Sequence, residues 1–136
     1  MSETQASDAL MEVVFAALDH GIDSVRGGGP LIPFVLEEGE AGRSLSRFAA
    51  ERLEEGVEQA RAHASASSQD RVAVAWDGYL TVDGERSDAV FVEAQERATP
   101  SSLVFAQRYR PGGRVRRLDI VGNAAFAGPG EGLLPS

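Results

Sequence analysis

The feature that most constrains the fold is an alternation of apolar and polar residues that begins at Arg71 and extends through most of the second half of the chain. Alternation with a period of two is typical of β-strands that bury one face. It occurs in four segments, residues 71–82, 87–96, 102–110 and 114–122. Asp83-Gly84 is a strong signal for a two-residue hairpin turn, and RATPSS and RPGG supply the next two turns. Because short connections join antiparallel neighbours, the four segments predict a β-meander.

Two helices are predicted ahead of the meander. Residues 7–20 place apolar side chains at helical spacing, with Ser7 suited to cap the helix and Gly21 suited to end it. Residues 44–64 give the clearest helical pattern, an apolar stripe opposite an acidic face. Gly56 lies inside this second helix, and close approach of another backbone would explain it.

Residues 30–38 predict a strand between the two helices. Pro30 and Pro33 cannot donate hydrogen bonds to a neighbouring strand, so we expect an edge strand or an irregular start. Together the elements predict the α+β class, with two main helices packed on a four- to five-stranded, mostly antiparallel sheet. We expect one domain over residues 1–122 and an irregular tail rich in glycine and proline over residues 123–136.

The charge of the chain limits its partners. The net charge is −8, and the 13 basic residues are all arginine. A domain that binds nucleic acid usually presents a basic patch, and an acidic chain is repelled by DNA, RNA and anionic lipid. We therefore expect no nucleic-acid partner and no membrane partner, and we interpret the basic strip of residues 108–117 as a charged hairpin tip. The abundance of arginine, alanine and glycine indicates a GC-rich bacterial genome.

The absence of cysteine excludes disulfides, a thiolate nucleophile and cysteine-type zinc sites. The opening residues MSETQASDAL carry acids where a secretory signal has a basic region. No segment approaches the length of an apolar membrane span. From these observations we expect a cytoplasmic protein.

Three short patterns that suggest chemistry have structural interpretations. RGGGPLIPFV, residues 26–35, lies between a predicted helix and a strand, whereas a phosphate-binding loop needs a strand, then glycines, then a helix. DHGIDS, residues 19–24, contains Asp, His and Ser, but catalytic triads are assembled in space and no GxSxG elbow is present. An aspartate followed by Glu93-Ala94-Gln95 loosely resembles the acidic clusters of restriction-type nucleases, but the chain has no lysine and no helix is predicted after the sheet. We predict neither a metal site nor a cofactor.

The register of the meander yields one candidate binding site. Centring the first hairpin on Asp83-Gly84 places Trp76 opposite Phe91. Centring the second loop on residues 98–102 places Glu93 opposite Gln107, and the third turn places Tyr109 opposite Arg114. One face of the sheet then carries the candidate ligand- or partner-binding residues Trp76, Phe91, Glu93, Gln107, Tyr109 and Arg116.

A carboxylate among aromatic side chains is partly desolvated, so it needs a positively charged partner. In this register Arg116 is the arginine nearest to Glu93. The structural interpretation of that pair is a cross-sheet ion pair. The opposite face carries small residues, which would let a helix approach closely. The aromatic face must then be covered by something else. The sequence allows four covers: the two helices packed on it as an ordinary hydrophobic core, a partner subunit, a ligand, or the tail through Phe126, Leu133 and Leu134.

Two classes of function follow. The first is a non-enzymatic binding or regulatory module, with a protein partner or a second copy, that acts as a homodimer through its sheet. The alternative is a small-molecule-binding protein or an enzyme with a pocket on a concave sheet face, where Glu93 is the base and Arg116 holds an anionic group. The order helix, strand, helix and four strands is similar to NTF2-like cone folds and profilin-like sheets in element order alone, which implies such a face. The sequence favours the first class and leaves catalysis open.

Overall fold

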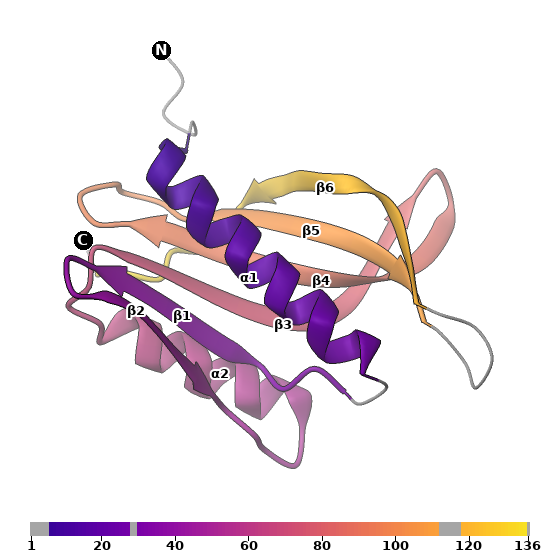
Figure 1. Cartoon of the computed structure of the whole chain (residues 1–136), viewed down its shortest axis with the longest axis horizontal. Coiled ribbons are helices and arrows are strands. Elements are labelled where there is room, and N and C mark those ends of the chain that lie inside the picture. Colours follow the sequence, from indigo (N-terminus) through magenta and orange to yellow (C-terminus); the bar gives the residue numbers. More distant parts are fainter. Residues whose placement is uncertain (1–5, 28–29, 112–117, 136) are drawn as a thin grey trace.

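A computed structural model describes residues 6–27, 30–111 and 118–135. The elements are α1 (Asp8–Arg26), β1 (Phe34–Gly39), β2 (Gly42–Arg47), α2 (Leu53–Ser65), β3 (Arg71–Val82), β4 (Glu85–Glu96), β5 (Leu103–Arg110) and β6 (Asp119–Pro129). The strands form one six-stranded antiparallel sheet in the order β2-β1-β3-β4-β5-β6 (Figure 1). The α+β class and the antiparallel meander are therefore confirmed, whereas the expected count of four to five strands is too low.

The additional strand comes from the segment that was expected to be the clearest helix. Residues 44–64 divide into the end of β2, a short connection and α2. Leu45 lies opposite Leu36 in the β1–β2 hairpin, so an apolar residue that extended the helical stripe belongs to a strand instead. Pairing with β1 satisfies the backbone of this segment, and tertiary context here overrides the helical pattern. The prediction of a continuous helix over residues 44–64 was wrong.

Helix α1 is longer than the predicted residues 7–20. Ser7 does cap it, since its side-chain oxygen accepts a hydrogen bond from the Leu10 N–H at 3.0 Å. Gly21 does not end the helix but lies buried within it. A Cβ added at Gly21 would lie 2.6 Å from a methyl group of Val90, so this glycine allows the helix to pack closely on β4.

The sheet also continues into the segment that was expected to have no regular structure. Strand β6 runs to Pro129, beyond the predicted end of the domain at residue 122. Its register against β5 shifts twice, and Gly122 and Gly128 have positive φ angles of 68° and 138°. Bulges of this kind bend a strand. Gly122 and Gly128, which suggested an irregular tail, thus allow the backbone of an edge strand to bend.

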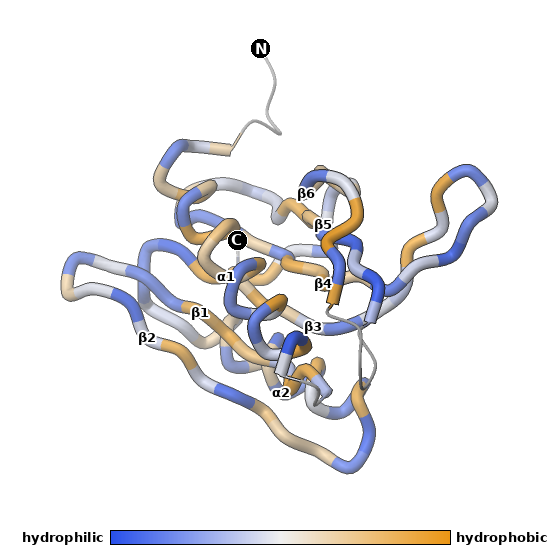
Figure 2. Tube along the Cα trace, turned by 45° about the vertical axis from the view of Figure 1, so that its right-hand side comes forward, coloured by the Kyte–Doolittle hydropathy of each residue, from blue (hydrophilic) through white to orange (hydrophobic). Residues whose placement is uncertain are grey.

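Apolar residues of the described chain gather in two clusters, one on each face of the sheet. The first joins the sheet to α1 through Leu10, Val13, Val14, Ala17, Leu18 and Ile22. The second joins the sheet to α2 through Ala60 and Ala64. Strand β3 serves both, with Ala73 and Ala75 in the first cluster and Val72 and Val74 in the second. Hydrophobic and hydrophilic residues can be followed in alternation along the strands in Figure 2. Neither helix in the described ranges is long and apolar enough to cross a membrane.

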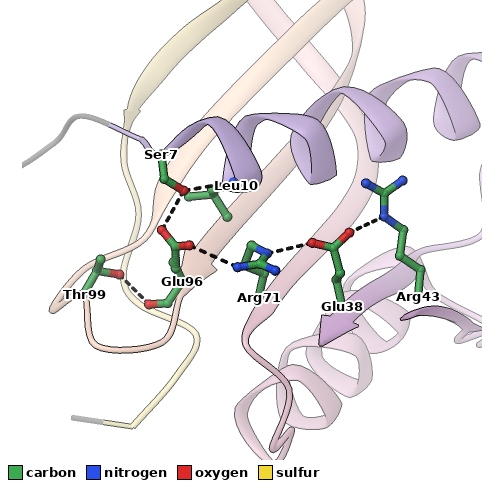
Figure 3. A network of polar contacts seen from close by, with 7 residues as sticks. All are labelled: Ser7, Leu10, Glu38, Arg43, Arg71, Glu96 and Thr99. Atoms are coloured by element: carbon green, nitrogen blue, oxygen red, sulfur yellow. Dashed lines mark hydrogen bonds and ion pairs between the residues drawn. The ribbon is translucent and has the colours of Figure 1, made fainter. Parts of the chain in front are cut away.

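A chain of ionic contacts crosses one end of the sheet (Figure 3). The hydroxyl of Ser7 donates to Glu96 at 2.8 Å, Arg71 donates to Glu96 at 3.3 Å and to Glu38 at 2.7 Å, and Arg43 also donates to Glu38. Burial opposes ionisation of Glu38, but the hydrogen bonds and charges of Arg43 and Arg71 outweigh it and lower the pKa of this carboxyl. The network joins the start of α1 to β4, β3, β1 and β2.

Gly56 provides a test of the packing of α2. A Cβ at this position would lie 2.6 Å from the backbone oxygen of Phe48, which confirms that another backbone approaches this glycine closely. We predict that Gly56→Ala lowers the free energy of unfolding by about 1–3 kcal/mol, although alanine favours an isolated helix. Chemical denaturation monitored by circular dichroism measures the loss. Gln59→Ala, at an exposed position of the same helix, is the control and should change stability by less than about 0.5 kcal/mol. Equal stability of Gly56→Ala and the unmodified chain would contradict the close approach.

Candidate functional site

Three of the six predicted site residues lie together on the α2 face of the sheet. Trp76 is opposite Phe91 in the β3–β4 ladder, as predicted, and their rings stack at 5.6 Å between centroids with 10° between planes. Glu93 lies on the same face and is buried. The first hairpin thus follows the register that Asp83-Gly84 indicated, and both turn residues have positive φ angles, 52° and 79°.

The second hairpin has a different register, which separates the other predicted residues from these three. Glu93 lies opposite Val104, and Gln107 lies opposite Val90. The prediction that Glu93 faces Gln107 was therefore wrong by three positions. The cause is a tight turn directly after β4, in which the Thr99 N–H donates to the Glu96 carbonyl at 3.1 Å and Ala98 adopts a φ of 73°.

A shift by an odd number of residues moves every side chain of a strand to the opposite face. Tyr109 accordingly belongs to the cluster beneath α1, and Gln107 lines the same side. Tyr109 lies opposite Ile120, not opposite Arg114. Arg114 and Arg116 fall outside the described residues. The structure therefore does not assemble the predicted six-residue site.

The cation that pairs with Glu93 comes from α2. Arg61 donates a hydrogen bond to one carboxylate oxygen of Glu93, and its other terminal nitrogen donates to the Gly132 carbonyl at 3.2 Å. The hydroxyl of Ser102 donates to the second carboxylate oxygen, and the Gly132 N–H lies 3.3 Å from the same atom. The Glu93 side chain is only 3% exposed. Its carboxylate is thus engaged by three donors and serves as a structural anchor, which leaves it poorly placed to act as a general base.

Gln95 extends this anchor along β4. Its side-chain oxygen accepts from the N–H groups of Leu133 and Leu134 at 2.7 and 2.8 Å, and its side-chain nitrogen donates to the Thr99 carbonyl at 2.9 Å. Leu133 is buried in the α2-side cluster. The α2 face is thus covered by α2 over β1 and β3, and by residues 130–134 beside it. Of the covers that the sequence left open, the tail through Leu133 and Leu134 is one of those observed, whereas Phe126 is exposed.

A small pocket of about 380 Å³ opens beside this cover. Trp76, Arg61 and Glu93 line it on the sheet and helix side, and Gly130 and Glu131 line it on the other. Among the described residues, its charged lining consists of Arg61 and Glu93, which are paired with each other, and the exposed Glu131. Two of the predicted site residues, Trp76 and Glu93, therefore line this pocket, but Glu93 is already bound to Arg61.

A larger groove lies on the opposite face, between α1 and β6. Its volume is about 720 Å³, and the apolar part of its walls is formed by Phe15, Leu18 and Ile22 of α1 and by Ile120 of β6. The charged residues Asp19, Asp23 and Arg26 of α1 line it as well. Gln107 lies at its base and donates through its amide nitrogen to backbone carbonyls of Arg108, Val121 and Gly122. The groove exists because α1 lies over β3 and β4, which leaves β6 uncovered (Figure 1).

Large apolar side chains are exposed along this groove and beside it. Phe15 is 50% exposed, Ile120 is 45% exposed and Phe126 is 51% exposed. The Phe126 ring contacts Phe105 in an edge-on geometry, which places it on the α1 face as well. Exposed apolar groups that gather around a groove mark a binding surface more often than single exposed residues do. This surface, defined by Phe15, Ile120 and Phe126, is the candidate functional site.

Among the described residues, no group of three or more His, Cys, Asp and Glu side chains is arranged to hold a metal ion. His63 and Ser67 both contact the Glu37 carboxylate, at 2.7 and 2.6 Å, so the hydroxyl is bound to the acid and not to the imidazole. A serine nucleophile needs the base beside its hydroxyl. The cluster therefore lacks the geometry of a hydrolytic triad.

Comparison of the chain with protein-family models, with curated proteins and with solved structures finds no significant match. The candidate site therefore rests on geometry alone.

Sequence reasoning missed Phe15 and Arg61 as parts of these sites, whereas it named Leu133 as a possible cover without connecting it to Glu93 and Gln95. Phe15 lies off the apolar stripe of its helix, which is the signal that could have marked it as an exposed aromatic residue. Arg61 adjoins the buried positions of α2, where a charged residue needs a partner. No sequence signal connects residues 130–134 with Glu93 and Gln95, because that contact depends on the path of the chain after β6.

The ion pair of Arg61 with the buried Glu93 gives a prediction for the α2 face of the sheet. Arg61→Ala leaves a buried carboxylate without its cation, so we expect a loss of about 2–3 kcal/mol in the free energy of unfolding. Arg52→Ala, which breaks exposed ion pairs with Glu54 and Glu55 at the start of the same helix, should cost less than about 1 kcal/mol. A double-mutant cycle of Arg61→Ala with Glu93→Gln should give a coupling above about 1 kcal/mol. Zero coupling would show that the pair is not formed.

The pair of Asp77 and Tyr109 gives a second prediction. The Tyr109 hydroxyl donates to Asp77 at 2.8 Å, and burial followed by the influence of Asp77 raises the pKa of Tyr109. Burial also raises the pKa of Asp77 above its ordinary value of 3.8, with a further contribution from Asp88 and an opposing one from the Tyr109 hydrogen bond. A raised carboxyl pKa means that the folded chain holds this proton more tightly than the unfolded chain does.

Asp77 therefore destabilises the fold progressively as the pH rises from 3.8 through its raised pKa. Asp77→Asn removes this effect while keeping an oxygen that accepts from Tyr109. We predict that the variant gains stability relative to the unmodified chain across this window and keeps a gain of less than about 1 kcal/mol at neutral pH, since the pair is half-open to water. Denaturation curves at several pH values measure the difference. A variant that loses relative stability as the pH rises would contradict the assignment.

Proposed function

We propose that this chain is a non-enzymatic binding module that acts as a homodimer, and that two copies associate through β6 and the groove beside α1. The observation that carries the proposal is the exposed apolar surface of Phe15, Ile120 and Phe126 at an edge of the sheet. A second copy presents the same surface, so a two-fold arrangement buries both at once.

The two edges of the sheet differ in a way that favours β6 as the interface. Proteins protect free strand edges with charged residues, because an unprotected edge pairs with other chains. Strand β2, at one edge, carries Arg43 and Arg47, whereas β6 carries no charged residue from Ile120 to Pro129. In a chain with a net charge of −8, an uncharged strip is where two copies approach with the least repulsion.

Bulges near Gly122 and Gly128 interrupt the β6 ladder, so we place the contact between the two copies at the intervening residues. Antiparallel pairing of this part of β6 with its symmetry mate continues the sheet across the two-fold axis. Phe126 then lies close to the axis, and Ile120 and Phe15 lie toward the rim of the interface. The buried apolar area favours association, while the added backbone hydrogen bonds fix its register.

The engaged state of Glu93 supports a non-enzymatic role over catalysis at the Trp76 face. A second candidate function is small-molecule binding in the groove, which its volume of about 720 Å³ favours. Pockets of this size with apolar walls and a few polar groups hold small ligands. In that case the occupant contacts Phe15, Ile120 and the Gln107 amide, and the chain stays monomeric.

Light scattering coupled to size exclusion tests the homodimer. We predict a mass of twice the 14.4 kDa of the chain, and at least a tenfold weaker association, about 1.4 kcal/mol, for Phe126→Glu and for Ile120→Glu. The physical reason is that a carboxylate in the interface loses hydration and faces its symmetry mate. Tyr79→Glu, at an exposed aromatic residue on the β3–β4 hairpin, is the matched control and should leave the mass unchanged.

A monomeric unmodified chain at about 100 µM would remove the homodimer, because an interface of this kind should bind more tightly than that. Dissociation by Tyr79→Glu alone would move the interface to the β3–β4 hairpin. A monomeric chain that binds an apolar dye in the groove lined by Phe15 and Ile120 would favour the small-molecule function instead. Ile120→Glu should then abolish the dye binding.

A further inference from the structure

The segment of residues 130–134 is held on the sheet mainly through its backbone. The N–H of Gly130 donates to the Ser102 carbonyl at 3.0 Å, and the N–H of Gly132 donates to the Ser102 hydroxyl at 2.9 Å. Gln95 accepts from the next two N–H groups, and Arg61 donates to the Gly132 carbonyl. The side chains of Arg61, Glu93, Gln95 and Ser102 and the backbone carbonyl of Ser102 therefore all bind main-chain groups of this segment.

The receptor residues are unusual in their burial. Glu93 and Gln95 are each 2% exposed, and Ser102 is fully buried. Buried polar side chains are costly unless their hydrogen bonds are made. Here the backbone of residues 130–134 makes many of those hydrogen bonds. The buried polar side chains of the sheet therefore form a site whose hydrogen-bonding groups are paired when a peptide segment lies on it.

The site also imposes a sequence requirement on its occupant. A Cβ at position 130 would lie 2.3 Å from a Glu93 oxygen and 2.4 Å from the Ser102 hydroxyl, so this position needs glycine. Gly132 has a φ of 102°, which favours glycine for a different reason. Leu133 enters the apolar cluster and is 4% exposed. Glu131 is exposed, so its position places no such restriction on the side chain. The requirement is therefore Gly-x-Gly-Leu.

We propose that the α2 face is a peptide-binding site for Gly-x-Gly-Leu segments, and that residues 130–133 of this chain are its tethered occupant. A partner that presents the same motif binds at this site when the tethered segment leaves. The site is on the opposite face from the α1–β6 groove and does not depend on the homodimer. Recognition combines the backbone hydrogen bonds to Glu93, Gln95 and Ser102 with the Leu133 pocket.

Tethering explains why the site is filled in the intact chain. A covalently linked segment competes with an effective concentration in the millimolar range for a short flexible connection. Pro129, which directly precedes Gly130, is the last residue of β6 that is paired with β5, so the segment starts at a fixed point of the sheet. A free peptide must therefore exceed this local concentration to displace the segment from the unmodified chain.

The test releases the tethered segment in the full-length chain and offers the peptide of residues 129–136 as the probe. Leu133→Asp removes the buried leucine, and Gly130→Ala introduces the clash with Glu93, so each change weakens docking without altering the receptor. Hydrogen exchange of the amides of residues 130–134 reports release. The fluorescence of Trp76, the single tryptophan and a residue of the adjoining pocket, reports binding.

We expect both released variants to bind the peptide at least about tenfold more tightly than the unmodified chain does. Pro135→Asp, a change at the exposed residue that directly follows the segment, should keep the segment docked and behave as the unmodified chain. The same peptide carrying Leu133→Asp should not bind to any of them. Addition of Gln95→Ala to a released variant should abolish binding of the original peptide.

Failure of both released variants to bind the peptide at about 1 mM would overturn the proposal, because that concentration matches the tethered competitor. Unfolding of both variants would overturn it as well, since the segment would then be an integral part of the fold. Equal binding by the original and the Leu133→Asp peptide would show that the leucine pocket is not used, which also contradicts the site. A monomeric protein that binds the peptide would leave this site intact and remove only the homodimer.

Discussion

The pairing of β3 with β4 is the constraint on which the rest of the structure depends. Twelve residue pairs join the two strands from Arg71 with Glu96 to Val82 with Glu85, around the Asp83-Gly84 turn. This ladder decides which side chains face α1 and which face α2, because alternate residues of a strand point to opposite faces. Every other strand is added to it from one side or the other. The ionic network in Figure 3 then joins the open end of this hairpin to the start of α1 and to β1.

The parts of the fold that could be predicted from the sequence are those that local signals specify. The Asp83-Gly84 turn fixes its own register, and the cap at Ser7 is a short-range contact. The β2 strand could not be predicted, because Leu45 suits a helical stripe and a hairpin equally well until β1 is present to pair with it. The end of α1 was missed for a similar reason. Gly21 reads as a stop signal locally, whereas its actual role is set by Val90 on a distant strand.

The site that the sequence predicted around Trp76 and Glu93 was harder to place because it depends on two successive registers. An error of three positions in the β4–β5 hairpin leaves Trp76 and Glu93 together but transfers Gln107 and Tyr109 to the other face. The need of Glu93 for a cation was correctly anticipated, but Arg61 supplies it from a helix. Proximity across a sheet can be argued from turns, whereas proximity between a helix and a sheet follows from packing that a single sequence does not encode locally. The two proposed surfaces differ in their relation to the sheet. The homodimer interface lies on β6, which neither α1 nor α2 covers, and the peptide site lies on β4, which residues 130–134 cover.

Strand β3 places alternate residues in two separate apolar clusters, and this arrangement has a consequence for cooperativity. Ala73 and Ala75 cannot leave the α1 side unless the strand separates from its neighbours, and the same motion withdraws Val72 and Val74 from the α2 side. The two clusters share no helix, yet neither can open while the other keeps β3 in place. Among the strands, local opening is therefore confined to the outer elements β2 and β6, and the amide protons of β3 are protected by the sum of both cores. A sheet covered on both faces in this way transmits a disturbance on one side to the other through a single strand.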